Sequence, residues 1–337
     1  MDTTEIKALF QRFAQLRVGV IGDFAVDLYY TIQTETGEHS LETGQDVFWG
    51  SHPRASLGAA GNVVQNLAAL GVSHIQVIGC VGNDLFGREM QHLFATLKVN
   101  TQQLHVIAED WDTCVYTKPN RAGLEANRID FGTANTLSDQ RFTELVADLE
   151  KSLPDLDVLI INQQFAHPLL SEKRVTSLNN LISRFPNVCF VADMRDVGMH
   201  VRESILKVNT AELASFLRIE HPDHPDLDWC VSQGNAFRQR SGGPLLITRG
   251  QAGILYIDQH GIQTIDGLAL QGELDTVGAG DTVVATWAAC LGSGATPKQA
   301  LVVANLAAAV TVQKLAQTGT ASLSEILALH HTYAVHD

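Results

Sequence analysis

The sequence predicts an α/β fold in which a mostly parallel central sheet is covered by helices on both faces. Short runs rich in Val, Ile and Leu alternate with amphipathic helical patterns along nearly the whole chain. Uninterrupted apolar strands of this kind are typical of parallel strands, which are buried on both faces. No Pro-, Gly- or Ser-rich linker divides the chain, so we expect one domain over residues 1–337.

Apolar runs define the expected strands of the central sheet. In chain order they are RVGVIGD (17–23), HIQVIGCVG (74–82), DVLIINQ (157–163), NVCFVADM (187–194), ILKVN (205–209), PLLITRG (244–250) and GILYID (253–258). Helical patterns follow many of them, at residues 61–70, 86–97, 141–153, 211–217 and 283–291. Several strands end on a polar residue, namely Asp23, Asp193, Asn209 and Thr248. Because ligands bind beyond the carboxyl ends of such strands, these ends indicate a site.

Two polar segments interrupt the alternation, at residues 31–55 and 113–132. The second segment has the pattern of two strands around an NRAG turn. Together they are expected to form a small antiparallel sheet outside the main layer, which closes over a ligand as a lid or pairs with another subunit. Because an exposed strand edge favours pairing, a homodimer is the expected assembly.

The composition argues against several classes of protein. A net charge of −14 argues against nucleic acid as the main partner, since phosphate binding needs clustered Lys and Arg. No apolar run is long enough to cross a membrane, and the N-terminus lacks the features of a secretory signal. The five cysteines are scattered and mostly lie in apolar runs, as expected for reduced thiols in a cytoplasmic protein.

The stretch DTVGAGD (275–281) carries the sharpest chemical signal. Gly278, Ala279 and Gly280 precede an apolar helix, and the unpaired N–H groups of a helix N-terminus bind anions. Asp281 would repel such an anion, so its presence indicates that it takes a proton from a second substrate. This combination suits phosphoryl transfer, which needs positioning and charge neutralisation rather than covalent help.

The same loop resembles the C-terminal signature of the ribokinase-like (PfkB) family of carbohydrate kinases. Similar stretches extend over nearly the whole chain, and they include IGDFAVDLYY, LGAAGNVVQNLAALG, VGNDLFG, KVNTAEL, ITRGQAG and ANLAAAVTVQKLAQTGTAS. The resemblance implies a three-layer α/β/α fold with a small β-sheet lid. It also implies an ATP-dependent sugar kinase that uses Mg²⁺ and a monovalent cation such as K⁺.

The family pattern assigns a role to each matching residue of this chain. Asp281 is implied as the catalytic base, beside an anion loop of Gly278, Ala279 and Gly280. The residues implied to bind the acceptor sugar are Asp27, Gly58 and Asn62. Those implied to bind the nucleotide are Asn209, Thr248, Gly250 and Asn305. Those implied to hold cations are Glu212 for Mg²⁺ through water, and Asp275 with Thr276 for the monovalent cation. After Gly58 the family usually has a second glycine, where this chain has Ala59.

Within the family, the chain is most similar to the kinases of D-glycero-β-D-manno-heptose 7-phosphate, on the stretches GDFAVDLYY, NRIDFG and VQKLAQTGTAS. We expect the nucleotidyltransferase domain that some members carry to be absent, because the chain stops at residue 337. That branch usually has an acidic residue, an aromatic and a Lys-Gly pair where this chain has Gln164, Phe165, His167 and Pro168. Arg195 is therefore the expected cation for the phosphate of a phosphorylated acceptor.

Alternatives remain open at this point. Within the kinases, the acceptor is a phosphorylated heptose or another sugar or nucleoside, such as fructose phosphate or ribose. A non-catalytic sugar- or nucleotide-binding protein is the rival outside them, although binding alone does not need the base. A dinucleotide-dependent oxidoreductase is excluded because GDFAVD lacks the spaced glycines. Some residues also have structural interpretations, with Asn62 as a helix cap, Asn209 and Glu212 as a capping pair, and Arg128 and Asp130 as a solvated strand face.

Overall fold

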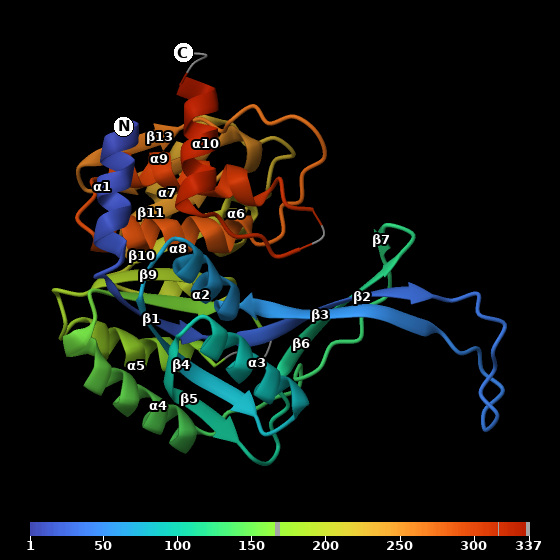
Figure 1. The fold of residues 1–337 in the computed structure, drawn as a ribbon. Coiled ribbons are helices and arrows are strands. Elements are labelled where there is room, and N and C mark those ends of the chain that lie inside the picture. Colours follow the sequence, from blue (N-terminus) through green and yellow to red (C-terminus); the bar gives the residue numbers. More distant parts are fainter. Residues whose placement is uncertain (166–168, 316, 335–337) are drawn as a thin grey trace.

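The computed structural model describes residues 1–165, 169–315 and 317–334, and a nine-stranded sheet forms its centre (Figure 1). Its strands are β1 Arg17–Gly22, β4 His74–Gly82, β5 Asn100–Ile107, β8 Val158–Gln163, β9 Cys189–Met194, β10 Ile205–Asn209, β11 Leu245–Thr248, β12 Ile254–Asp258 and β13 Gly261–Ile265. They lie in the order β13-β12-β11-β10-β9-β8-β1-β4-β5. Only the pairs that involve β12 are antiparallel in this sheet, so the mostly parallel sheet is confirmed.

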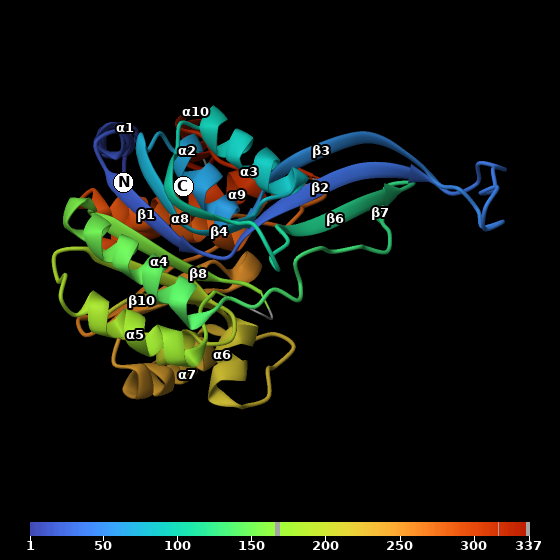
Figure 2. The ribbon, with the colours of Figure 1, turned by 90° about the horizontal axis from the view of Figure 1, so that it is seen from below.

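Helices cover both faces of the central sheet, which gives three layers (Figure 2). One face is covered by α1 Thr3–Phe13, α2 Ala60–Ala69, α3 Leu85–Thr96, α8 Ala279–Gly292, α9 Pro297–Thr311 and α10 Leu323–Ala334. The other is covered by α4 Asp139–Ser152, α5 Glu172–Ile182, α6 Thr210–Leu217 and α7 Leu227–Ser241. Strand β8 shows why the runs are continuously apolar: Val158 and Ile160 enter the first core, whereas Leu159 and Ile161 enter the second.

A second, four-stranded sheet projects from the body (Figures 1 and 2). Its strands, in spatial order, are β3 Trp49–Ala59, β2 Phe24–Gln33, β6 Cys114–Arg121 and β7 Leu124–Glu125. The small separate sheet is therefore confirmed, but it is mixed rather than antiparallel, because β2 and β6 run in the same direction. Strand β2 begins before the expected polar segment 31–55, and β3 ends after it. The parts outside that segment are mostly buried and apolar, so the polar pattern did not include them.

A β-bulge divides the β2–β3 ribbon into an inner and an outer part. Tyr29 and Thr31 of β2 pair with Arg54 and Ser51 of β3, so β3 has one residue more between the two pairs. His52 lies in this step with a φ of 51°. We call the outer part, residues 31–51, the arm. It comprises the outer ends of β2 and β3 and the connection between them, and it extends away from the central sheet in Figure 1.

None of the helices in the described ranges combines the length and the apolar character needed to cross a membrane. All five cysteines belong to the described residues and are free thiols. Burial raises the pKa of the Cys80 and Cys114 thiols to about 12, so both stay protonated and unreactive at neutral pH.

Ala59, between β3 and α2, has a backbone conformation that favours glycine. Its φ is 51° and its ψ is −130°. The side chain is buried against Ala25 and Cys114, so the surrounding packing holds the residue in place. Strain of this kind costs about 1–3 kcal/mol.

We expect Ala59→Gly to raise the free energy of unfolding by about 1 kcal/mol, because relief of strain outweighs the entropy that glycine adds to the unfolded chain. Urea unfolding followed by circular dichroism measures the change. Ala60→Gly is the matched control, since Ala60 is the first residue of α2 and fully buried. It should lower the stability by about 1 kcal/mol. A loss of stability in Ala59→Gly as well would contradict the proposed strain.

Candidate active site

The candidate active site lies at the carboxyl end of the central sheet, where α8 begins. Asn162 on β8 is beside Asp193 on β9, which is beside Lys207 on β10. Paired residues of neighbouring strands point to the same face of a sheet. Because α8 packs on β8 and β9, these polar side chains lie beneath its first turn.

The turn before α8 leaves two backbone donors open. Gly278 is the N-cap of α8 and has a φ of 79°, which favours glycine. The N–H of Ala279 donates to Thr276 O at 3.2 Å. The N–H groups of Gly280 and Asp281 have no acceptor within the described part of the chain. An anion at this helix end would therefore meet two unpaired donors.

Each carboxylate oxygen of Asp281 accepts a hydrogen bond from a side-chain amide. Asn62 Nδ2 donates to Oδ2 at 2.7 Å, and Gln164 Nε2 donates to Oδ1 at 3.0 Å. Burial raises the pKa of Asp281 to about 6, and the negative charge of Asp193 adds to this, while both amides and Lys207 oppose it. A carboxylate with this pKa is ionised at neutral pH and can accept a proton.

Asn62 is held by its neighbours in α2 with its amide toward that carboxylate. Gln65 Nε2 and Asn66 Nδ2 donate to Asn62 Oδ1 at 2.7 and 3.1 Å. A Cβ on Gly278 would lie only 2.7 Å from Asn62 Nδ2, so the contact requires glycine there. The N-cap of α2 is Ala59. The interpretation of Asn62 as a helix cap is therefore wrong.

A buried ion pair lies beneath the anion loop. Lys207 Nζ is 3.1 and 3.3 Å from the two carboxylate oxygens of Asp193, and the side chains are 6% and 8% exposed. A Cβ on Gly280 would lie 3.0 Å from Lys207 Nζ, which places the ammonium directly under the loop. Burial by itself would lower the pKa of Lys207. The carboxylates of Asp193, Glu212 and Asp281 instead raise it, so the group remains a cation at neutral pH.

Asn209 and Glu212 form a capping box at the start of α6, which confirms their structural interpretation. Asn209 Oδ1 accepts from Glu212 N at 2.8 Å, and Glu212 Oε2 accepts from Asn209 N at 2.7 Å. No cluster of three or more metal-binding side chains occurs among the residues that the structure describes. Mg²⁺ can be held by one or two carboxylates when water and phosphate oxygens supply its other ligands. Glu212 Oε1, which takes no part in the box, fits such a role.

Asp27 is buried on the inner part of β2. Its Oδ2 accepts a hydrogen bond from Thr318 Oγ1 at 2.9 Å. A Cβ on Gly58 would lie 2.7 Å from Asp27 Oδ1, so glycine allows the close contact with β3. Burial raises the pKa of Asp27, whereas the positive charges of Lys118 and Arg128 oppose that shift. Lys118 on β6 and Arg128 in the loop after β7 are therefore the cations that influence Asp27, the expected sugar-binding carboxylate.

Arg195 follows β9 at the same edge and is exposed. Its guanidinium forms no ion pair with any other residue in the described ranges. Its positive charge opposes the burial that raises the pKa of Tyr116 and the burial that raises the pKa of Glu212. The Arg128 guanidinium lies over the Tyr116 ring, 4.9 Å from its centroid, and pairs with Asp130 at 2.6 Å. Arg128 is exposed, as the solvated interpretation expects, but it lies in the loop after β7 rather than on a strand and it faces an aromatic side chain.

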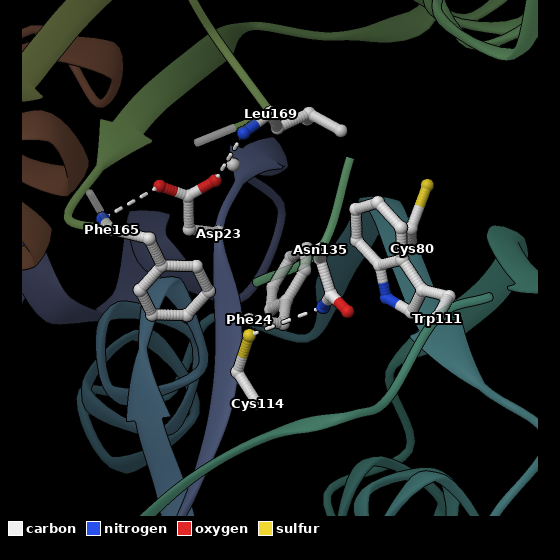
Figure 3. A pocket seen from close by; sticks show the side chains of 9 residues that line it. Asp23, Phe24, Cys80, Trp111, Cys114, Asn135, Phe165 and Leu169 are labelled. Carbon is white, nitrogen blue, oxygen red and sulfur yellow. Dashed lines mark hydrogen bonds between the residues drawn. The ribbon is translucent and has the colours of Figure 1, made fainter. Parts of the chain in front are cut away.

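The loop after β8 is anchored by the buried carboxylate of Asp23 (Figure 3). Asp23 Oδ2 accepts from the backbone N–H groups of Gln164 and Phe165 at 2.9 and 3.1 Å, and Oδ1 accepts from Leu169 N at 2.8 Å. Burial raises the pKa of Asp23 to about 6 against the effect of these bonds. The adjoining cavity holds roughly one water molecule, so a sugar does not fit in it.

His167 and Pro168, which occupy the expected Lys-Gly positions, lie outside the described residues. The residues assigned to the nucleotide lie on β10, on β11 and its following turn, and on α9. Asn209 and Thr248 are neighbours in register, and Gly250 follows β11 with a φ of 57°. Asn305 is on the helix layer, where it donates to the carbonyl of the residue after β13 at 3.0 Å.

The loop that leads to the anion turn is tied to the end of α9. Asp275 N donates to Val312 O at 2.8 Å, and Asp275 Oδ1 accepts from Val277 N at 3.0 Å. Thr276 follows it and is exposed. The two residues assigned to a monovalent cation are therefore next to the anion turn, as their place in the sequence requires.

The model of the pfkB family of carbohydrate kinases matches residues 26–323. This span includes Asp27, Asp193 and Asp281, the capping box and the anion turn described above. The chain belongs to the pfkB family. The resemblance drawn from the motifs is confirmed, and membership makes the chain a phosphotransferase with a hydroxyl acceptor rather than a non-catalytic binding protein.

Other similar proteins agree with this family. The bifunctional proteins HldE of Hyphomonas neptunium and Shewanella baltica are each 28% identical over 97% of this chain. The chain spans 66% of the length of these relatives. Phosphofructokinase-2 from Escherichia coli in complex with potassium has a TM-score of 0.74 at 15% identity, over 95% of this chain and 99% of that one. Ribokinase from Thermotoga maritima has a TM-score of 0.69 at 18% identity, over 94% and 99%. Both confirm the ribokinase-like fold.

Three residues that contact the expected site residues were not predicted from the sequence to do so. Lys207 had a detectable signal, because it is the one charged residue in the apolar run ILKVN. Gln164 was noted only as a departure from a family pattern, and its contact with Asp281 spans 117 residues. Thr318 had no local signal, because its contact with Asp27 joins opposite ends of the chain.

We expect Lys207→Met to lower the free energy of unfolding by about 3–5 kcal/mol, because it leaves the Asp193 carboxylate buried without its cation. Replacing both partners, as Lys207→Met with Asp193→Leu, should recover most of this loss. Urea unfolding measures both effects. Lys173→Met is the control, since it removes the exposed pair of Lys173 and Asp139 and should leave stability unchanged. Equal stability of Lys207→Met and this control would contradict the importance of the buried pair.

Proposed function

We propose that this chain is an ATP-dependent kinase that phosphorylates a hydroxyl of an already phosphorylated sugar similar to heptose 7-phosphate. The observation that carries the proposal is a base and an anion site in the first turn of one helix, formed by Asp281 and the open N–H groups of Gly280 and Asp281. This arrangement suits a phosphoryl group that is transferred to a hydroxyl held against the base. The similarity to HldE relatives over 97% of the chain favours the heptose phosphate.

In the proposed reaction, the acceptor oxygen bonds to the γ-phosphorus of ATP and its proton passes to Asp281. The bond from the γ-phosphorus to the bridging oxygen breaks, and ADP leaves with that electron pair. The N–H groups of Gly280 and Asp281 face the charge on the transferring group. The Lys207 ammonium beneath them adds a positive charge that needs no reorganisation during the reaction.

Mg²⁺, when bound, would neutralise phosphate charge, and Glu212 would hold it through water by Oε1. Asp275 and Thr276 are proposed to bind a monovalent cation beside the anion turn. The residues proposed to bind ATP are Asn209, Thr248, Gly250 and Asn305. Asn209 and Thr248 are neighbours at the carboxyl ends of β10 and β11, which supports a shared contact with one part of the nucleotide.

The acceptor is proposed to bind between Asp27 and Asp281, with Gly58 and Asn62 beside it. Its phosphate would meet Arg195, since a guanidinium binds phosphate through two parallel hydrogen bonds. Arg128, whose guanidinium lies over the Tyr116 ring, offers a second cation, although Asp130 offsets part of its charge. This supply of cations supports a phosphorylated acceptor even without the lysine of the heptose-phosphate branch.

A homodimer through the arm is part of the proposal. Leu41 and Trp49 on the arm are 99% and 51% exposed, and Leu124 on β7 is 75% exposed. Exposed apolar side chains beside open strand edges favour association with another chain. A second copy that covers the arm would bury them.

We expect Asp281→Asn to lower turnover by about 10²–10⁴, the usual contribution of a general base, while ATP binding is retained. The measurement is coupled ADP release with the best acceptor from a screen of free and phosphorylated sugars. Near wild-type turnover would remove Asp281 from the proposed mechanism.

The pH dependence provides an independent test of the same residue. Because the pKa of Asp281 is raised to about 6, the base is protonated and inactive below that pH, and kcat/KM should fall as the pH decreases through 6. Sugar phosphates and ATP also titrate near pH 6. Asp281→Asn is therefore the control, because the pH dependence of its residual activity comes from titration of the substrates and not from residue 281. An acid limb of equal steepness in wild type and variant would contradict the assignment.

We expect Arg195→Ala to raise the KM for the phosphorylated acceptor by about tenfold or more, because a charge-assisted hydrogen-bonded contact is lost. The KM for ATP should change little. Arg202→Ala is a control for the loss of an exposed arginine on a nearby loop. A preference for an unphosphorylated sugar, with Arg195→Ala silent, would overturn the heptose-phosphate proposal and leave the general sugar kinase.

A further inference from the structure

The two amides that bind Asp281 differ in how firmly they are held. Asn62 is 1% exposed and lies inside α2. Its Oδ1 accepts from Gln65 and Asn66, so its side chain is fixed at both ends. Gln164 is half-buried in a loop, and its Oε1 accepts no hydrogen bond from the described residues. Asn62 is therefore a permanent donor, whereas within the described residues a single hydrogen bond holds the end of the Gln164 side chain.

The backbone beneath Gln164 is nevertheless fixed. Asp23 accepts the N–H groups of Gln164 and Phe165. On the preceding residue, Gln163 Nε2 donates to Asp196 Oδ2 at 3.0 Å, and Gln163 Oε1 accepts from Asp196 N at 2.9 Å. The Gln164 side chain can therefore rotate without movement of the loop that carries it.

A base needs an accessible lone pair on a carboxylate oxygen to accept a proton, and an amide already occupies one lone pair on each oxygen of Asp281. In Asp281, Oδ2 is held by the fixed amide and Oδ1 by the rotatable one, so Oδ1 is the oxygen that can be released. We propose, on the basis of the proposed kinase function, that Gln164 is a positioning residue that occupies the place of the acceptor hydroxyl on Asp281 Oδ1 until the acceptor displaces it.

We call the hydrogen bond from Gln164 to Asp281 Oδ1 the cap. Its consequence is that ATP is protected from hydrolysis. In an empty site, an uncapped Asp281 would accept a proton from water while the water oxygen bonds to the γ-phosphorus. The bond to the bridging oxygen of ADP would break, and phosphate and ADP would be released. While the Gln164 amide donates to Oδ1, it fills the place of that water. The amide nitrogen itself is not a nucleophile toward the γ-phosphorus. The cap thus reserves the base for an acceptor that competes for Oδ1.

The test measures phosphate release from MgATP alone, without any sugar, so the identity of the acceptor is not needed. Gln164→Ala should hydrolyse ATP about fivefold faster than wild type, the factor that one net hydrogen bond of ordinary strength is worth. Gln164→Asn, which keeps the amide but is too short for the 3.0 Å contact, should be faster as well. Adding Asp281→Asn to Gln164→Ala should abolish the gain, which a purely structural role of Gln164 would not explain.

Gln91→Ala is the matched control. Gln91 is also half-buried and donates one hydrogen bond, to Gly87 O at 3.2 Å, but it lies on α3 away from the base. Its hydrolysis rate should equal that of the wild type. Thermal melting identifies variants that retain the fold, and a gain in either folded Gln164 variant supports the cap.

Two negative outcomes are distinct. If wild type phosphorylates a sugar but neither folded Gln164 variant hydrolyses ATP faster, the cap is overturned and the kinase function stands. If wild type transfers phosphate to no sugar in the screen, the proposed function fails and the cap fails with it.

Discussion

The buried ammonium of Lys207 is the charge on which the arrangement of the site depends. Three carboxylates, of Asp193, Glu212 and Asp281, come close enough to influence its pKa. Without a cation among them, their mutual repulsion and burial would favour protonation. With it, Asp281 keeps a pKa of about 6 although it is buried. The ion pair therefore lies under the turn before α8, and its ammonium, together with the amide of Asn62, opposes protonation of the proposed base Asp281.

Patterns within short stretches were sufficient to predict the layers of the fold and the GAGD turn. The apolar runs predicted the parallel strands because burial on both faces leaves the same signature in every strand. They could not predict contacts that join distant segments, such as Gln164 with Asp281 or Thr318 with Asp27. The parallel direction of β6 beside β2 could not be predicted either, since it depends on the path of the loops that connect the second sheet to the central one.

Two capping interpretations competed with functional ones, and the structure gives them different outcomes. Asn209 and Glu212 do form the capping box, and the same bonds fix Glu212 with one oxygen left for another ligand. Asn62 caps nothing, because the strained Ala59 precedes the helix. A capping motif predicted from its full reciprocal pattern was thus more reliable than one predicted from a single polar residue.

The bulge at His52 has a consequence for how this chain can change over time. A one-residue slip in a regular ribbon turns every side chain to the opposite face. Here the step at Tyr29 and Thr31 absorbs one extra residue before the strands reach Asp27 and Gly58. Insertions and deletions at the tip of the ribbon can therefore accumulate while Asp27 keeps its orientation. The surface of the arm and the surroundings of Asp27 can therefore diverge independently on the same two strands.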